Sequence, residues 1–192
     1  MVQASSRRSA EEMKWNKEEI LIVDNFFDEP HIKEIHKDLD NLMSQGKFAN
    51  RYITQNNIHY QQSYFNVDLN KDHFAVKVVE NFFKKKYDIK INNMVSHYWF
   101  SGINVTPAPH TDYGMINCLV QLKGNNLLHN GTAFYEQRDA ESYLHSHFGF
   151  KENRAIIFDG NTRVHASLQS FGKEASPRHI MTNFIDKKSH SL

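Results

Sequence analysis

The sequence contains a single cysteine, Cys118, among 192 residues. One thiol cannot form an intramolecular disulfide, which fits a reducing compartment. No apolar run approaches the roughly 20 residues that a membrane-spanning helix needs. Residues 1–14 also lack the apolar core of a signal peptide. These absences predict a cytoplasmic protein with no membrane segment.

Neither sign of charge is in excess. Lysine and arginine number 23 and aspartate and glutamate 22, so the formal net charge is +1. This balance argues against a dedicated nucleic-acid surface. The longest basic run, Lys84-Lys85-Lys86, falls where a helix should end, and cations there favour the helix dipole. We therefore expect no nucleic-acid partner, and the oligomeric state stays open.

The composition is that of a globular domain. Hydrophobic residues make up 40% of the chain, with 14 Phe and 8 Tyr, and the length suits one domain with a sizeable core. We predict a single domain over residues 15–186, between a flexible N-terminal tail over 1–14 and a C-terminal tail over 187–192.

Two helices are predicted early in the chain, after a short strand over 19–24. The first begins with Asp28 as N-cap and Pro30 in its first turn, and Gly46 can end it. Its apolar stripe consists of Ile32, Ile35, Leu39, Leu42 and Met43. The second spans 71–87, with Asn70 as its cap, and its inward side chains are Phe74, Val78, Phe82 and Phe83. Residues 47–69 read as mixed strands and loops.

Short strands separated by turns follow from residue 89. The predicted strands are 91–100, 114–122, 132–136, 154–158, 163–169 and 178–185. Residues 138–149 are predicted to form a short helical insertion. Regularly spaced strands after early helices indicate an antiparallel barrel or sandwich with helices packed on one side.

His110-Thr111-Asp112 is the candidate metal-binding segment. Residues two apart project to the same side of an extended segment, so both side chains could bind one ion. With His165, they would give two imidazoles and one carboxylate on one face of a metal, an arrangement typical of non-haem Fe(II) oxygenases. Histidine is abundant, with 12 in the chain, so a lone His-x-Asp pair is weak evidence. A second pair, His36-Lys37-Asp38, is expected on a helix surface, where the two side chains diverge.

Four segments in order resemble the Fe(II)- and 2-oxoglutarate-dependent dioxygenases, in particular the prolyl 4-hydroxylase-like branch. They are Ile22-Val23-Asp24-Asn25-Phe26-Phe27 before a helix, His97-Tyr98-Trp99-Phe100-Ser101-Gly102 before His110-Thr111-Asp112, Ala155-Ile156-Ile157-Phe158-Asp159 before His165, and Arg178 thirteen residues after that histidine. The resemblance covers roughly residues 19–186.

The resemblance implies a fold and a chemistry. The fold would be α+β but mainly β, a double-stranded β-helix (jelly roll, cupin-like) with the N-terminal helices packed on one sheet. His110, Asp112 and His165 would bind Fe(II), with 2-oxoglutarate and O2 as co-substrates and ascorbate as a supporting reductant. The implied reaction hydroxylates an aliphatic C–H bond and releases succinate and CO2.

The resemblance also assigns co-substrate contacts. Arg178 would bind the distal carboxylate, because a planar guanidinium can donate two parallel hydrogen bonds. The family often has Ser or Thr two positions later, where this chain has Ile180, so Thr182 on the same strand face is a candidate second donor. Other candidates are Tyr98, and Asn117 and Gln121 from one face of the strand over 114–122; satisfied core residues are the alternative.

Several interpretations stay open. The resemblance favours a prolyl residue in a peptide or protein, or free proline, as substrate, with another small molecule as the next choice. Rival functions are a non-catalytic jelly-roll binding protein and a hydrolytic zinc site with two His, one Asp and a water. We expect His129, His145 and His147 to be surface or lid residues rather than a second metal site, and Arg163 to face water.

Overall fold

The computed structural model describes residues 19–55, 58–101, 109–112, 116–125, 130–136, 143–167 and 178–187. The helices are α1 (Glu29–Ser44) and α2 (Phe74–Tyr87). The strands are β1 (Leu21–Asp24), β2 (Ala49–Gln55), β3 (Ile58–Leu69), β4 (Ile91–Ser101), β5 (Ile116–Lys123), β6 (Gly131–Tyr135), β7 (Leu144–Gly149), β8 (Arg154–Asp159), β9 (Val164–Ala166) and β10 (His179–Lys187). The predicted N-terminal tail over 1–14 lies outside the described residues, and so does the predicted C-terminal tail over 187–192 except for Lys187, which ends β10.

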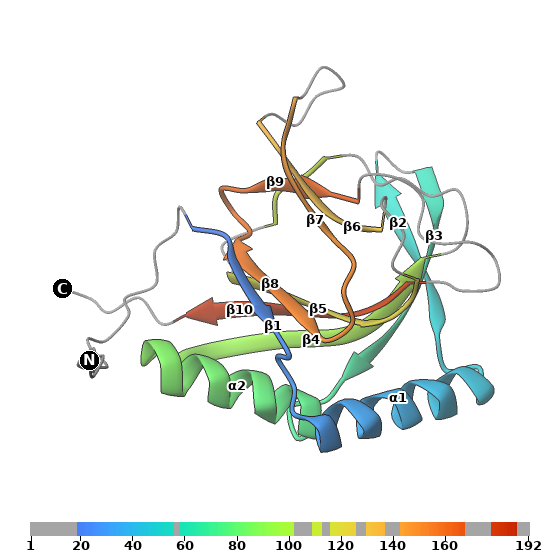
Figure 1. Cartoon of the computed structure of the whole chain (residues 1–192). Helices are drawn as coiled ribbons and strands as arrows, with labels where there is room; N and C mark the ends of the chain where they lie inside the picture. The colour runs from blue at the N-terminus through green and yellow to red at the C-terminus, as the bar shows by residue number, and fades with distance from the viewer. Residues whose placement is uncertain are drawn as a thin grey trace, which may run out of the picture.

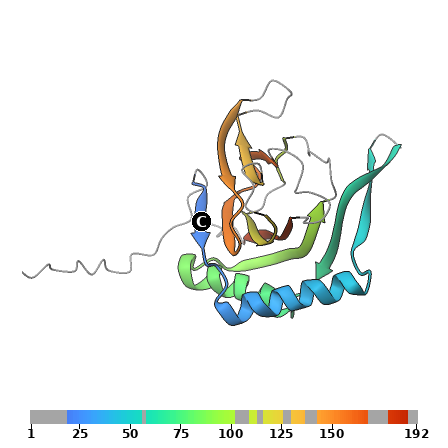
Figure 2. The same ribbon diagram turned by 45° about the vertical axis from the view of Figure 1, so that its right-hand side comes forward.

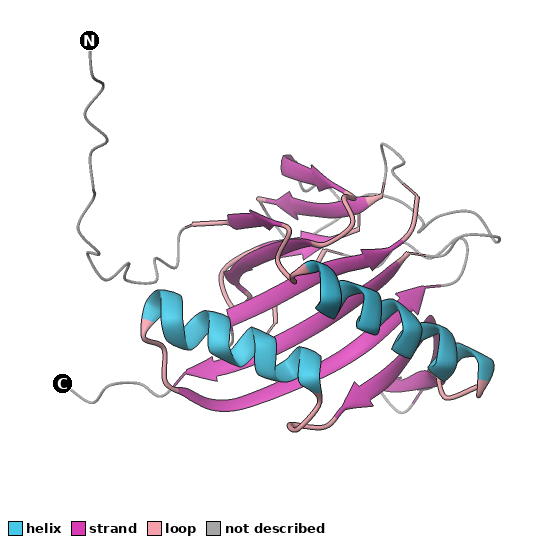
Figure 3. Ribbon diagram, turned by 60° about the horizontal axis from the view of Figure 1, so that its bottom comes forward, coloured by secondary structure: helices cyan, strands magenta, loops and turns pink. Residues whose placement is uncertain are grey.

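Two antiparallel sheets form the body of the protein (Figure 1). The larger has seven strands in the order β1-β8-β5-β10-β4-β3-β2, and the smaller has three in the order β7-β6-β9. Both helices lie across one face of the large sheet (Figure 3), and the small sheet lies over its other face. Figure 2 shows the β2–β3 hairpin rising on the opposite side of the molecule from β7. The predicted sandwich with helices on one side is confirmed.

The first helix begins and ends as predicted. The Asp28 carboxylate accepts a hydrogen bond from the backbone N–H of His31 at 3.0 Å, which satisfies one of the unpaired donors of the first turn. Gly46 follows the helix with a φ of +61°, a left-handed conformation that favours glycine. Ile35 and Leu39 are fully buried, but Met43 is 41% exposed, so the apolar stripe is one residue shorter than predicted.

The second helix begins three residues later than predicted. His73 is its N-cap, and its Nδ1 accepts the backbone N–H of Ala75 at 3.3 Å. Asn70 instead forms the turn before the helix, where its side chain accepts the backbone N–H of Asp72 at 2.9 Å. The prediction of Asn70 as the N-cap was therefore wrong. Asparagine favours both N-caps and turns, so the sequence alone does not distinguish the two roles.

Residues 144–149 form strand β7, so the predicted helical insertion over 138–149 is wrong there; residues 137–142 lie outside the described residues. The segment pairs with β6, and Phe134 and Phe148 pack edge-to-face with ring centroids 5.8 Å apart. A partner strand therefore decides the conformation of this histidine-rich segment, which has no strong pattern of its own.

Strand alternation divides the interior into two cores. The helix-facing core contains residues such as Val79, Phe83, Cys118 and Met181. The inner core, between the two sheets, contains Leu119, Phe134, Ile156 and Phe158. Successive residues of a strand belong to opposite faces of a sheet, so alternate residues of β4, β5, β8 and β10 point toward the small sheet. We call this side of the large sheet the inner face.

In the described residues, no helix combines the length and apolar character needed to span a membrane.

Candidate metal centre and co-substrate site

The structure brings His110, Asp112 and His165 together. Each offers one candidate ligand atom, and these atoms lie within 4.8 Å of one another. His110 and His165 are held by two reciprocal backbone hydrogen bonds of 3.1 and 2.8 Å, and the Asp112 N–H donates to the carbonyl of Gly160 at 2.7 Å. The main chain therefore aligns all three side chains.

His165 has the protonation pattern that a metal ligand needs. Its Nδ1 lies 3.0 Å from the carbonyl oxygen of Arg163, an acceptor only, so Nδ1 carries the proton and donates. Nε2 is then left with a lone pair, and it faces Asp112 Oδ2 at 3.3 Å. The contribution of Arg163 to the site is thus its backbone carbonyl.

The facing atoms of His165 and Asp112 fit a shared cation. Two lone pairs 3.3 Å apart repel each other unless a proton or a metal ion lies between them. Neighbouring ligands at about 2.1 Å from one metal ion, at a right angle, lie roughly 3.0 Å apart. The donor set of two imidazoles and one carboxylate therefore suits a divalent metal with open positions.

Asp112 is ionised in this environment. Burial raises the pKa of its carboxyl, but the nearby His165, the hydrogen bond from Asn117 and the nearby His110 lower it, and the pKa lies below its ordinary value. Nδ2 of Asn117 donates to Asp112 Oδ2. Asn117 lies on the inner face as predicted, but the contact the structure gives it is to the metal-binding carboxylate.

Arg178 lies just before β10 and is 2% exposed. Burial lowers the pKa of its guanidinium to about 9, so it remains a cation at neutral pH. It donates to the carbonyl of Gly131 in the small sheet, and its guanidinium carbon lies 5.9 Å from the centre of the Trp99 ring. This buried cation lies between the two sheets, where an anionic ligand could neutralise it.

Thr182 is a suitable second donor on the inner face, and both Thr182 and Arg178 contact Trp99. Its hydroxyl oxygen accepts the indole N–H of Trp99, which leaves the hydroxyl hydrogen to donate elsewhere. Thr182 is buried and stands two residues beyond Ile180 on the same strand face. Trp99 was not among the predicted site residues, although its place one residue after Tyr98 puts it on the opposite face of β4.

Tyr98 is a correction. Its side chain belongs to the helix-facing core, with its ring 5.7 Å from that of His73 in an edge-to-face contact. Burial and the nearby carboxylate of Asp38 raise the pKa of Tyr98. The large sheet separates Tyr98 from the inner face, so its prediction as a co-substrate contact was wrong. Trp99 lies on the inner face, where Tyr98 had been predicted to lie.

Gln121 lies on the inner face as predicted and is fully buried. Its Oε1 accepts the backbone N–H of Lys151 at 2.6 Å, which ties the side chain to the turn before β8. Its Nε2 has no hydrogen-bond partner among the described residues. The amide nitrogen therefore keeps both of its N–H donors for a ligand. In the large sheet, Gln121 of β5 pairs directly with Ile180 of β10.

The other histidines that the structure describes form no second group with metal-binding spacing. His145 and His147 both lie in β7, an edge strand of the small sheet, and His129 lies outside the described residues. Within the described ranges, His110, Asp112 and His165 are the one group of three or more His, Cys, Asp or Glu with metal-binding spacing. The helix pair His36 and Asp38 diverges as expected but is partly buried: His36 contacts the carbonyl of Leu122, and Asp38 contacts His73.

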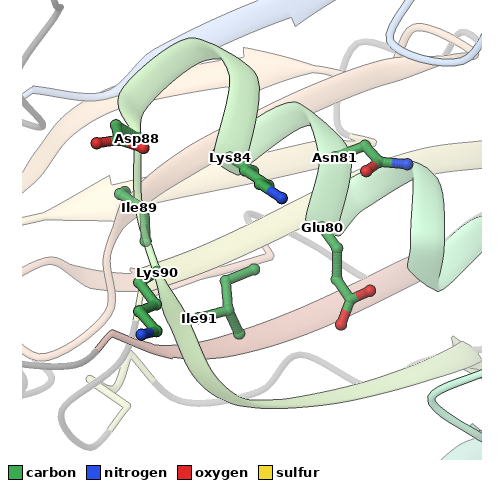
Figure 4. Close-up of a pocket in the computed structure, with 7 residues that line it drawn as sticks. All are labelled: Glu80, Asn81, Lys84, Asp88, Ile89, Lys90 and Ile91. Carbon is green, nitrogen blue, oxygen red and sulfur yellow. The ribbon is translucent and has the colours of Figure 1, made fainter.

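A separate cavity of ≈ 460 Å³ lies at the C-terminal end of α2, on the helix side of the large sheet (Figure 4). Its lining is Glu80, Asn81, Lys84, Asp88, Ile89, Lys90 and Ile91. Acidic and basic groups alternate around it, without the convergent buried polar groups that mark a ligand site.

No family model and no curated protein matches this chain, but solved structures do. A prolyl-4-hydroxylase from Pseudomonas putida aligns with a TM-score of 0.64 and 10% identity, over 87% of this chain and 92% of that chain. A prolyl hydroxylase from Trichoplax adhaerens, in complex with a peptide of the hypoxia inducible factor oxygen degradation domain, gives 0.63 and 14% over 88% and 84%. The α-ketoglutarate-dependent epimerase SnoN gives 0.65 and 8% over 88% and 78%.

These likenesses confirm the predicted fold. The chain has the double-stranded β-helix fold of prolyl hydroxylases and of a 2-oxoglutarate-dependent epimerase, mainly β with two helices on the large sheet. Its candidate metal group of two histidines and one aspartate lies between the sheets of that fold.

Proposed function

We propose that this protein is an Fe(II)- and 2-oxoglutarate-dependent oxygenase that hydroxylates an aliphatic C–H bond, with a prolyl residue in a peptide or free proline as its substrate. The observation that carries the proposal is the pairing of two features on one inner face: the opposed lone pairs of His165 and Asp112, and the buried guanidinium of Arg178. A metal site alone has many uses, but a metal site with a buried cation suits a chelating dicarboxylate.

Each residue has a role in this proposal. His110, Asp112 and His165 would hold Fe(II), and the bound iron would supply the O2 activation that couples loss of CO2 from 2-oxoglutarate to hydroxylation. Arg178 would bind the distal carboxylate with parallel hydrogen bonds. The Thr182 hydroxyl, oriented by the indole of Trp99, would donate to the same co-substrate.

Gln121 Nε2 would be a further donor for the co-substrate, because the opposite end of its amide is already held. The apolar rings of Phe134 and Phe158 pack beside His165, with the Phe158 centroid 4.6 Å from that of the imidazole. They would exclude water from one side of the metal. A peptide substrate is favoured by the fold's likeness to hydroxylases of which one was solved with a peptide.

The test needs no substrate. Fe(II) and then 2-oxoglutarate are added to the protein without oxygen, and the visible metal-to-ligand charge-transfer band of the chelate is recorded. We expect the band in the wild type and in His145→Ala, a matched histidine control in β7, and its loss in His165→Ala. Iron binding without a band would favour the non-catalytic or zinc alternatives, and no metal binding by folded protein would refute the proposal.

Succinate formation against candidate substrates then tests the reaction. Turnover of a proline-containing peptide with a mass increase of one oxygen would support prolyl hydroxylation. Turnover without added oxygen in the product would instead favour another reaction on the same site, such as the epimerisation named for SnoN.

A further inference from the structure

Asn117 contacts the candidate metal ligand Asp112. It is the second residue of β5 and is fully buried, and its Nδ2 donates to Asp112 Oδ2. An ionised carboxylate can only accept hydrogen bonds, so the amide nitrogen must be the end that faces it. The orientation of the amide is therefore set by Asp112.

Gly160 completes this arrangement from the end of β8. Its carbonyl accepts the backbone N–H of Asp112 at 2.7 Å, so Gly160 and Asn117 hold the same residue from two directions. A Cβ at position 160 would lie 2.8 Å from Asn117 Oδ1, 2.9 Å from Cγ and 3.0 Å from Nδ2. The amide thus lies flat against the glycine, and glycine is needed here for space.

We propose that Asn117, seated against Gly160, is a positioning residue that fixes the Asp112 carboxylate for metal binding. The inference rests on the proposed function, since it assumes that Asp112 is a ligand. A ligating carboxylate has two oxygens and a rotatable bond, and a hydrogen bond from an outer residue restricts that rotation and keeps the group ionised.

A purely structural role would give a different pattern of contacts. A buried amide that serves only the fold satisfies both of its ends, as Asn183 does: its Oδ1 accepts from Ser96 at 2.7 Å, and its Nδ2 donates to the Cys118 carbonyl at 2.9 Å. Asn117 Oδ1, by contrast, is buried with no hydrogen-bond partner among the described residues. Its donor end is the part in use, and that end is directed at Asp112.

The test measures binding of Mn(II) alone by electron paramagnetic resonance titration, so it does not depend on turnover. We expect Asn117→Ala to weaken binding by about 10- to 100-fold, the usual effect of losing an outer hydrogen bond to a ligand. Asn183→Ala, a matched buried asparagine on the other face of the sheet, should lower thermal stability without changing the affinity.

Gly160→Ala supplies an independent perturbation. Gly160 is not one of the described glycines with a left-handed φ, so an alanine at this position is opposed only by lack of space. It should weaken Mn(II) binding in the wild type by displacing the Asn117 amide. In the Asn117→Ala background the three atoms nearest to the added methyl are gone, so the two effects should not add. If the losses of Mn(II) affinity in the two single variants add fully in the double variant, Gly160 acts independently of Asn117. That result would overturn the proposal that the two residues position Asp112 together.

The outcomes separate the inference from the proposed function. If Asp112→Ala keeps wild-type Mn(II) affinity, the metal assignment itself fails. If Asp112→Ala loses Mn(II) while Asn117→Ala binds it normally, only the positioning role fails. If Asn117→Ala does not fold, Gly160→Ala alone decides: normal binding in that variant refutes the inference.

Discussion

Replacing Arg178 with methionine should make the metal-free protein more stable while it abolishes co-substrate binding. The side chain is 2% exposed, and burial lowers the pKa of the guanidinium to about 9. A buried cation that costs stability in the free protein is expected at a site that binds an anionic ligand. Methionine has a similar length and no charge, so it can fill much of the same space.

The magnitude follows from two opposing effects of Arg178. The fall of the Arg178 pKa to about 9 corresponds to at most roughly 5 kcal/mol at 1.36 kcal/mol per pKa unit, which is an upper bound for the cost of the buried charge. Loss of the hydrogen bond from Arg178 to the Gly131 carbonyl removes about 1.5 to 3 kcal/mol. The net gain for Arg178→Met is therefore at most about 2 to 3.5 kcal/mol, which in a chain of this size raises Tm by at most roughly 4 to 14 °C.

The sign of the pH dependence follows from the depressed pKa of Arg178. Below pH about 9, the folded wild type holds the buried charge and bears its full cost. As the pH rises above about 9, the folded state loses the proton before the unfolded state does, and the cost is relieved. The advantage of Arg178→Met should thus be present at pH 7 and shrink above pH 9.

The assay is thermal unfolding of the metal-free protein at pH 7, repeated with Mn(II) and 2-oxoglutarate. At a hundredfold excess over its Kd, a ligand stabilises the native state by about 2.7 kcal/mol, and we expect this gain in the wild type but not in Arg178→Met. Arg178→Lys keeps a charge without the bidentate geometry, so it should show neither the gain in apo stability nor full ligand stabilisation. A destabilised metal-free Arg178→Met protein that still responds to 2-oxoglutarate would refute the reasoning.

Three further outcomes are expected. Trp99→Phe removes the indole donor to Thr182 and should raise the Kd for 2-oxoglutarate about 5- to 10-fold, as loss of one hydrogen bond predicts, in a calorimetric titration with Mn(II) present. Phe83→Ala removes a fully buried ring from the helix-facing core and should lower the free energy of unfolding by about 3 to 5 kcal/mol in a urea titration. Two basic neighbours hold the pKa of Asp24 below its ordinary value of 3.8, so its ion pairs should stabilise the fold above about pH 4 and be lost as the pH falls; because the pairs are exposed, Asp24→Asn should cost no more than about 1 kcal/mol at pH 7.

Strand periodicity predicted most of the inner face correctly. Asn117, Leu119 and Gln121 were expected to share one side of their strand, and the structure places Leu119 in the inner core while the intervening Cys118 and Val120 join the helix-facing core. Short strands with a strict period of two carry this information locally. The same holds for the first helix, whose cap at Asp28 and end at Gly46 are local signals.

The error at Tyr98 has a different origin. Periodicity shows that Tyr98 and Trp99 face opposite ways, but not which of them faces the small sheet. That choice depends on the register with β10, where Trp99 pairs with Ile180 and Tyr98 pairs with Met181. Register is set by long-range packing, and a one-residue slip reverses the faces. A resemblance built on a tyrosine at that place thus selected the wrong neighbour.

The contact between Asn117 and Asp112 lay beyond sequence reasoning for a related reason. Five residues separate the two, and neither strand nor helix periodicity brings residues so spaced together. The contact forms because Asp112 hydrogen-bonds to Gly160 at the end of β8, while Asn117 pairs with Phe158 of the same strand. The segment that carries Asp112 and Asn117 must therefore be placed correctly against the end of β8, which comes much later in the chain, before the amide meets the carboxylate. Ligand types and their order could be predicted from the chain, whereas the groups that orient the ligands depend on how the sheets close around them.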